Sequence, residues 1–143
     1  MSTEEKTIKS PSTKEKGTYF YGVGRRKACT ARAKIYPGKE FEIIVDGKKA
    51  QEYFPHYYYQ VLENMTTNVG FKQGAIHLFV RGGGVMAQAE AARLAIAKAL
   101  LKIDEGFRPV LRMYDYLTTD IRKVLPKRPG LRKARKREQW SKR

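Results

Sequence analysis

The sequence predicts a two-layer α+β domain followed by a long basic tail. Three segments with the pattern of β-strands come first, then a helix, a fourth strand and further helices, an order typical of a sheet packed against helices. Residues 122–143 hold eleven Lys or Arg and one Glu, and offer almost nothing to a hydrophobic core. Within the 143 residues we therefore assign 18–121 to one globular domain, a usual size for a single domain.

Residues 1–17 are predicted to form a disordered arm, because Ser, Thr, Lys and Glu dominate them and such a composition buries too little apolar surface to fold. They lack the apolar stretch of a secretory signal, and no segment approaches the roughly 18 apolar residues of a membrane span. Cys29 is the single cysteine, which excludes an internal disulfide and a cysteine-built metal site. We expect a soluble, cytoplasmic protein with no membrane contact.

The clearest strand is ACTARAKIY, residues 28–36. Small or apolar side chains alternate with polar ones, and this period of two predicts one buried face and one basic face. The buried face is expected to hold Cys29, Ala31, Ala33 and Ile35, and the basic face Thr30, Arg32, Lys34 and Tyr36.

Three further strands are expected, over residues 18–24, 40–45 and 75–80. TYFYGVG is aromatic and β-prone, and EFEIIV ends at the tight-turn signal Asp46-Gly47. AIHLFV alternates, with Ile76, Leu78 and Val80 facing inward.

Helices are expected between and after these strands. QEYFPHYYYQVLENM predicts a short helix over residues 56–65, since Pro55 has to stand at a helix start or a break. MAQAEAARLAIAKALLKI, residues 86–103, has a core-facing stripe over about a third of its circumference, and its alanines permit close approach to a sheet. Leu94 and Leu101 lie on its far side, so residues 107–117 are expected to cover them.

No constellation in the sequence predicts catalysis. His56 and His77 lack a neighbouring nucleophile or paired carboxylate, and no group of His, Cys, Asp and Glu has metal-ligand spacing. GVGRRK, residues 22–27, lacks the third glycine of a dinucleotide-binding loop, and RGGG, residues 81–84, lacks the Gly-Lys-Ser/Thr of a P-loop. We expect a non-enzymatic protein with no cofactor and no metal.

Positive charge points to a polyanionic partner, either nucleic acid or an anionic membrane face. The formal net charge is +16, of which residues 122–143 carry +10 and residues 18–121 carry +5. Within the domain, Arg25, Arg26 and Lys27 adjoin the basic strand face of Arg32 and Lys34. This clustering favours RNA contact over a merely solvated loop.

The glycine-rich segment RGGG has two interpretations. It is either a tight strand-to-helix connection or a phosphate site at a helix N-terminus, where bare backbone amides meet the ligand. The residues that would form such a site are Arg81, Gly82, Gly83 and Gly84.

The tail is the strongest functional signal. Pro126 and Pro129 prevent a continuous helix at its beginning, and mutual repulsion of its cations opposes a compact state, so ordering requires phosphates. Fully extended, the tail reaches about 70 Å. A nuclear-localisation tag or a nonspecific DNA arm is the alternative explanation. The expected RNA contacts are Lys127, Arg128, Arg132, Lys133, Arg135, Lys136 and Arg137.

A known family shares several of these segments. From about residue 21 to residue 143 the chain contains, in order, GVGRRKACTARAKIYPG, DGKKAQEYF, VRGGGVMAQAEAARLAIAKALL, YLTTDIRK and QWSKR. Together they resemble the ribosomal protein S nine family, the ninth protein of the small ribosomal subunit, in its bacterial and organellar branch. Trp140 stands where this family more often has Phe.

The resemblance implies a four-stranded sheet with helices on one side, similar to the second domain of ribosomal protein S five. It also implies a place in the head of the small subunit, among neighbouring head proteins and bound to small-subunit ribosomal RNA. In the family the tail threads through this RNA toward the anticodon stem-loop of peptidyl-site tRNA. By motif position, the residues nearest that tRNA are Lys142 and Arg143.

Two other protein classes stay open from the residues alone. The protein subunit of ribonuclease P has a related fold but needs a basic helix, whereas the helix at 86–103 carries only Arg93, Lys98 and Lys102. A nonspecific DNA-condensing protein would bind duplex DNA as tightly as ribosomal RNA at equal salt. An organellar ribosome is an alternative to a cytoplasmic one.

Overall fold

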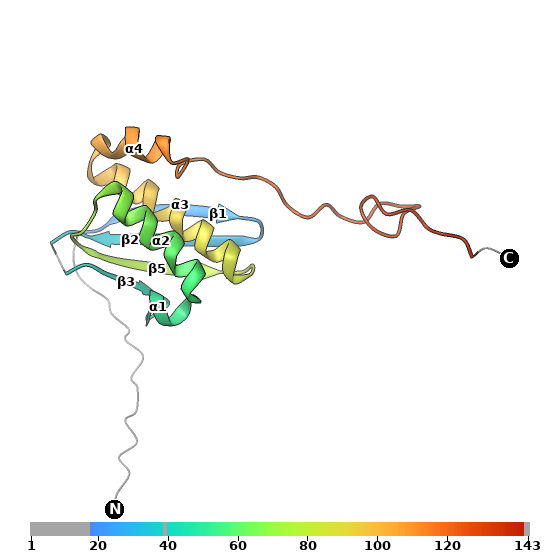
Figure 1. Cartoon of the computed structure of the whole chain (residues 1–143), viewed down its shortest axis with the longest axis horizontal. Coiled ribbons are helices and arrows are strands. Elements are labelled where there is room, and N and C mark those ends of the chain that lie inside the picture. The colour runs from blue at the N-terminus through green and yellow to red at the C-terminus, as the bar shows by residue number, and fades with distance from the viewer. Residues whose placement is uncertain (1–17, 39, 142–143) are drawn as a thin grey trace, which may run out of the picture.

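Five strands form one sheet in the computed structural model, which describes residues 18–38 and 40–141 (Figure 1). The strands are β1 (Phe20–Arg26), β2 (Cys29–Tyr36), β3 (Glu42–Val45), β4 (Lys48–Lys49) and β5 (Ala75–Arg81). In the sheet order β1-β2-β5-β3-β4, β3 runs parallel to β5 and the other neighbouring pairs are antiparallel. The predicted α+β class is confirmed. The predicted arm at residues 1–17 lies outside the described residues.

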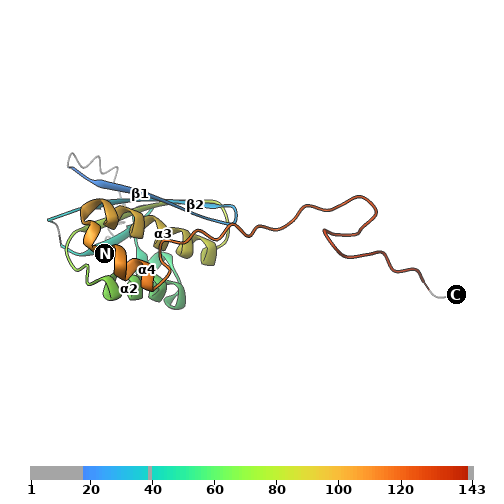
Figure 2. The same cartoon turned by 90° about the horizontal axis from the view of Figure 1, so that it is seen from above.

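The helices gather on one side of this sheet, as Figure 2 shows from above. They are α1 (Ala50–Tyr53), α2 (His56–Val69), α3 (Val85–Ile103) and α4 (Arg108–Met113), with the 3-10 turn η1 (Glu105–Phe107) before α4. The long helix α3 packs on β1 and β2, and α2 packs on α3. The opposite face of β1, β2 and β5 is therefore left without a covering helix in the described part of the chain.

The sheet has one strand more than the four expected, because the tight turn after β3 leads into a short fifth strand. Asp46 and Gly47 have φ values of 46° and 85°, the pair of positive angles that a two-residue hairpin turn requires. The chain then pairs two lysines of β4 with β3 before α1 begins. Since both lysines are exposed, no hydrophobic pattern marks this strand.

The buried strand faces are as predicted. Ile76, Leu78 and Val80 of β5 are at most 6% exposed. In β2, the four side chains of the expected inner face, Cys29, Ala31, Ala33 and Ile35, are at most 1% exposed. Tyr36, expected on the basic face, is buried as well, because its ring packs against the rings of Tyr19 and His77.

The contact between α3 and β1 is made by backbone rather than by side chains. A Cβ added at Gly24 would lie 2.0 Å from the carbonyl oxygen of Ala91, and one at Gly22 would lie 2.1 Å from that of Ala95. The predicted close approach of the alanine helix to the sheet is confirmed. The buried surface of α3 is wider than the expected stripe, however, because its ten buried residues lie around nearly the whole circumference of the helix. The helix lies between the sheet and the outer helices.

The outer helices complete the core. The segment at residues 107–117 buries Leu111 completely and leaves Tyr116 only 8% exposed. Helix α4 packs on α2 and η1, and Tyr116 lies near Leu94 of α3, whereas Leu101 stays half-buried. Helix α2 starts after Pro55 as expected but is longer than the predicted 56–65, because it ends at Val69, before Gly70 with φ of 73°. Within the added turn, the buried Thr66 satisfies its hydroxyl by donating it to the carbonyl of Glu63 at 2.9 Å.

Candidate nucleic-acid interface

The open face of the sheet presents basic and aromatic side chains from three neighbouring strands. The register places Lys34 of β2 between Tyr21 of β1 and His77 of β5. One step along, Arg32 pairs with Phe79. A hollow of about 330 Å³ on this face is lined by Tyr21, Thr30, Arg32, Lys34, Asp46, Phe79 and Arg81. The basic strand face predicted from the sequence therefore exists, and aromatic rings and Arg81 are added to it.

These aromatic rings are what the sequence analysis missed. The Lys34 Nζ atom lies 4.7 Å from the centre of the Tyr19 ring and 5.5 Å from that of Phe79, within the range of cation–π attraction. Tyr19 and Phe79 are each 45% exposed. The alternation in β5 assigns Phe79 to the outer face, but only the pairing of β5 with β2 places it beside Arg32.

The two predicted basic loops lie together at one end of the sheet. A Cβ added at Gly82 would lie 2.9 Å from the carbonyl oxygen of Ala28, and one at Gly83 would lie 2.9 Å from Cys29 Cβ. The loop between β5 and α3 thus packs directly on the turn between β1 and β2. Since Gly82 and Gly83 have φ values of 75° and 68°, this tight connection favours glycine. A phosphate contact by the loop stays a prediction.

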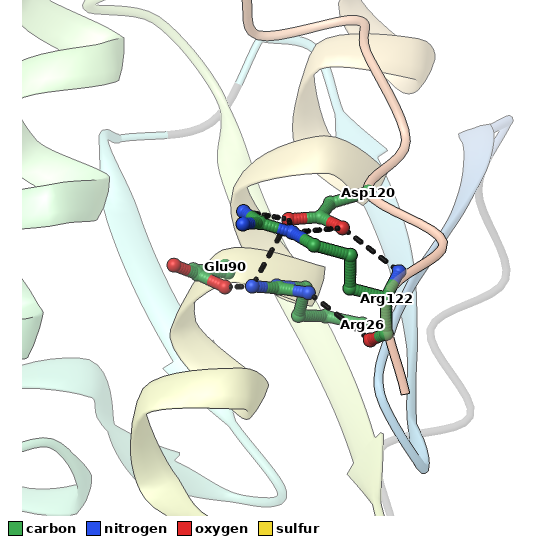
Figure 3. Close-up of polar contacts among 4 residues, drawn as sticks. All are labelled: Arg26, Glu90, Asp120 and Arg122. Atoms are coloured by element: carbon green, nitrogen blue, oxygen red, sulfur yellow. Dashed lines mark hydrogen bonds and ion pairs between the residues drawn. The ribbon is translucent and has the colours of Figure 1, made fainter. Parts of the chain in front are cut away.

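Arg26 holds the root of the tail to the domain (Figure 3). Its side chain is only 14% exposed and pairs with Glu90 of α3 and, at 3.1 Å, with Asp120. One Nη atom also donates to the backbone carbonyl of Arg122 at 3.4 Å. We call Arg26, Glu90, Asp120 and Arg122 the root cluster. Contact of Arg26 with RNA stays a prediction, whereas its ion pairs are a feature of the folded chain.

Arg122 completes the root cluster by binding Asp120. Its backbone N–H donates to one carboxylate oxygen at 2.9 Å, and its Nη2 donates to the other at 2.7 Å. Hydrogen bonds from the Arg122 side chain and backbone, assisted by the charges of Arg122 and Arg26, hold the pKa of the Asp120 carboxyl well below its usual range. At neutral pH Asp120 is therefore ionised and paired with both arginines.

Beyond the root cluster the tail runs away from the domain (Figure 1 and Figure 2). It has no helix or strand in its described part, and a local loop is closed by the Arg132 amide donating to the Lys136 carbonyl at 2.8 Å. Trp140 is 89% exposed. The predicted tail contacts Lys127, Arg128, Arg132, Lys133, Arg135, Lys136 and Arg137 are all exposed. Lys142 and Arg143 lie outside the described residues.

Other kinds of site have little support in the described residues. Cys29 is 1% exposed, and burial raises the pKa of its thiol, which keeps it protonated and unreactive. Across residues 18–38 and 40–141, no group of three or more His, Cys, Asp or Glu is placed to hold a metal ion. No helix in the same residues has the length and apolar character needed to cross a membrane.

The fold and its surface define a class of basic α+β proteins whose cations lie on one sheet face, on two adjoining loops and along an extended tail. The family model described as ribosomal protein S9/S16 matches residues 24–143. The chain belongs to this family, whose members are structural components of the ribosome and not enzymes. It is thus a protein of the small ribosomal subunit that takes part in translation, with ribosomal RNA and other ribosomal proteins as partners.

The substitution Asp120→Asn is expected to loosen the root of the tail. The Asn amide would lack the negative charge with which Asp120 pairs with both Arg26 and Arg122. The chain around residue 122 should then be held less firmly, so trypsin should cleave after Arg122 and Lys123 several-fold faster, as followed by mass spectrometry. Asp115→Asn is the matched control, because Asp115 is exposed and its φ of 54° is one that Asn tolerates. Equal cleavage rates in both variants and the parent would contradict an anchoring role.

The lowered pKa of Asp120 also sets the pH range of this anchoring. A carboxyl whose pKa is lower in the folded than in the unfolded chain, where it is about 3.9, stabilises the folded state above the unfolded value. This stabilisation is lost as the pH falls through the pKa of the folded state. The root cluster should therefore persist from neutral pH to below about pH 4. In a carboxyl carbon NMR titration, Asp120 should titrate well below the unfolded value of about 3.9, and a midpoint at or above that value would contradict the pairing.

Proposed function

We propose that this chain binds the ribosomal RNA of the small-subunit head through three surfaces. The first is the open sheet face, with Arg32, Lys34 and Arg81. The second is the pair of adjoining loops at residues 25–27 and 81–84. The third is the tail at residues 122–143, which RNA orders along its length.

The state of the tail cations carries this proposal. Every Lys and Arg from residue 127 to residue 137 is exposed, and none of them pairs with a carboxylate among the described residues. Glu138 is the single acidic residue of the +10 tail. A tail of such charge density that lacks carboxylate partners is expected to bind phosphates. This binding is favourable because it releases the counterions that are condensed on the RNA. In a ribosomal protein the available polyanion is ribosomal RNA.

The β1–β2 loop and the beginning of the tail can serve one RNA strand, because they line one concave surface. A hollow of about 590 Å³ is lined by residues 25–30 of the β1–β2 hairpin together with residues 119–121 and Lys123. Arg25 and Lys27 are both exposed beside it. A phosphate backbone lying in this hollow would pass from the cations of the β1–β2 loop to Lys123 at the beginning of the tail.

The end of the tail is proposed to approach the anticodon stem-loop of peptidyl-site tRNA. This part rests on the order of the side chains, since Lys142 and Arg143 follow Glu138 and Trp140. An exposed indole stacks readily on a base, so Trp140 can anchor the tail in ribosomal RNA. The last two cations are then left to meet a second RNA.

Replacing Arg25 and Lys27 with Ala is expected to lower the salt dependence of RNA binding. Each phosphate contact contributes about 0.7–0.9 to the slope of log K against log salt, so the double variant should lose roughly 1.5 from that slope. Filter binding to a head-domain ribosomal RNA fragment measures it. Lys72→Ala with Lys98→Ala is the control, because both lysines are exposed and lie away from the loops. An unchanged slope in the Arg25/Lys27 variant would mean that the hairpin loop is only solvated.

Deleting residues 141–143 is expected to separate the two roles of the tail. The cations at residues 122–137 are retained, so incorporation into small subunits should be nearly unchanged. The two deleted cations, Lys142 and Arg143, are each expected to contribute about 1 kcal/mol or less to tRNA binding. Without them, tRNA should dissociate from the peptidyl site several-fold faster. The measurement uses purified subunits with full-length or shortened protein at matched magnesium and salt. Equal dissociation rates would remove the tRNA role from the proposal.

A further inference from the structure

The open sheet face combines stacking surfaces with cations, and its ligand is more specific than a phosphate backbone. Resting on the proposed function, we propose that this face binds an unpaired stretch of RNA, whose bases stack on Phe79 and on Tyr21. The cations between and beside these rings, Arg32, Lys34 and Arg81, would neutralise the phosphates of the same stretch. The ligand class is thus single-stranded ribosomal RNA rather than a duplex.

The spacing of the rings supports separate stacking platforms. Phe79 lies on β5 and Tyr21 on β1, with β2 between them. Neighbouring strands are about 4.8 Å apart, so the two columns of side chains are separated by about 10 Å. That is too wide to sandwich one base and suits two bases of an extended strand. The cations of β2 lie between the columns, where the backbone linking two such bases would pass.

The environment of the rings favours RNA over another protein as occupant. Phe79 is 45% exposed, yet the hollow around it is lined by three cations, Arg32, Lys34 and Arg81. An apolar protein surface would have to remove their hydration, which is costly without counter-charges. Every unpaired nucleotide offers the π-face of its base to the rings and its phosphate to the cations. A paired strand offers only the phosphates, because its bases are stacked within the helix.

One carboxylate, that of Asp46, determines how the bases and phosphates of a bound RNA would be oriented in the hollow. It lines the hollow together with Arg81 and Phe79, and it accepts a hydrogen bond from the Val80 backbone N–H at 3.4 Å. A carboxylate repels phosphate but accepts hydrogen bonds from the amino group of a base, as acidic side chains do from cytosine. Bases rather than phosphates are therefore expected above Asp46, with the backbone on the side of Arg32.

The test compares two RNA probes with the full-length chain. One is a single-stranded ten-nucleotide oligonucleotide of mixed sequence without internal pairing, and the other is a ten-base-pair RNA duplex, both followed by fluorescence anisotropy at one salt concentration. Phe79→Leu should weaken binding to the single strand about tenfold, the magnitude of one base–aromatic stack, and change duplex binding less than twofold. Phe79→Tyr, which keeps a ring, should restore single-strand binding.

The control is Tyr57→Leu, which removes an exposed ring (72% exposed) from α2 on the helix side of the sheet. It should change neither affinity, and urea unfolding midpoints should show that each variant is folded. The tail is present in every comparison and contributes equally. An equal effect of Phe79→Leu on both probes, or none on the single strand, would overturn the stacking site. Failure of the full-length chain to bind either probe with a salt-dependent affinity would instead remove the wider proposal of RNA binding.

Discussion

The backbone contact between α3 and β1 is the constraint on which the remaining structure depends. At Gly22 and Gly24 no side chain fits between strand and helix, since a Cβ would meet helix carbonyl oxygens at 2.1 and 2.0 Å. The helix therefore lies directly on the sheet, and the other helices pack around it on the same side. The opposite face stays open for its basic and aromatic side chains. The same contact brings Glu90 of α3 beside Arg26 at the end of β1.

Charge and geometry are supplied by different parts of the chain. The domain carries a modest +5 and closely packed loops, whereas the tail carries +10 and, in its described part, neither helix nor strand. The root cluster connects the two, because Arg26 is held by Glu90 and in turn holds Asp120 and the Arg122 carbonyl. A tail that leaves the domain from a fixed point would reach a defined region of the proposed RNA partner, even when its own residues adopt no regular structure.

Periodicity predicted most of the fold, and long-range pairing accounts for what it missed. The alternation in residues 28–36 and the alanine pattern of 86–103 correctly indicated the central strand and helix, and Asp46-Gly47 correctly indicated a tight turn. The second strand of that hairpin has only two exposed lysines and leaves no pattern. The sequence placed Arg26 in a basic loop, but its partners Glu90 and Asp120 are far along the chain, and only folding brings them together. The aromatic neighbours of Lys34 depend on strand register in the same way.

The central claim is that a preformed domain presents a tail that RNA orders. Backbone amide hydrogen exchange of the full chain, free and bound to a head-domain ribosomal RNA fragment, tests it most directly. Amides of β1, β2, β5 and α3 should be protected in both states, because sheet and helix hydrogen bonds hold them. Amides of residues 123–141 should exchange almost freely without RNA and at least about tenfold more slowly with it. Tail amides that are already protected in the free protein, or that stay unprotected in the complex, would contradict the account.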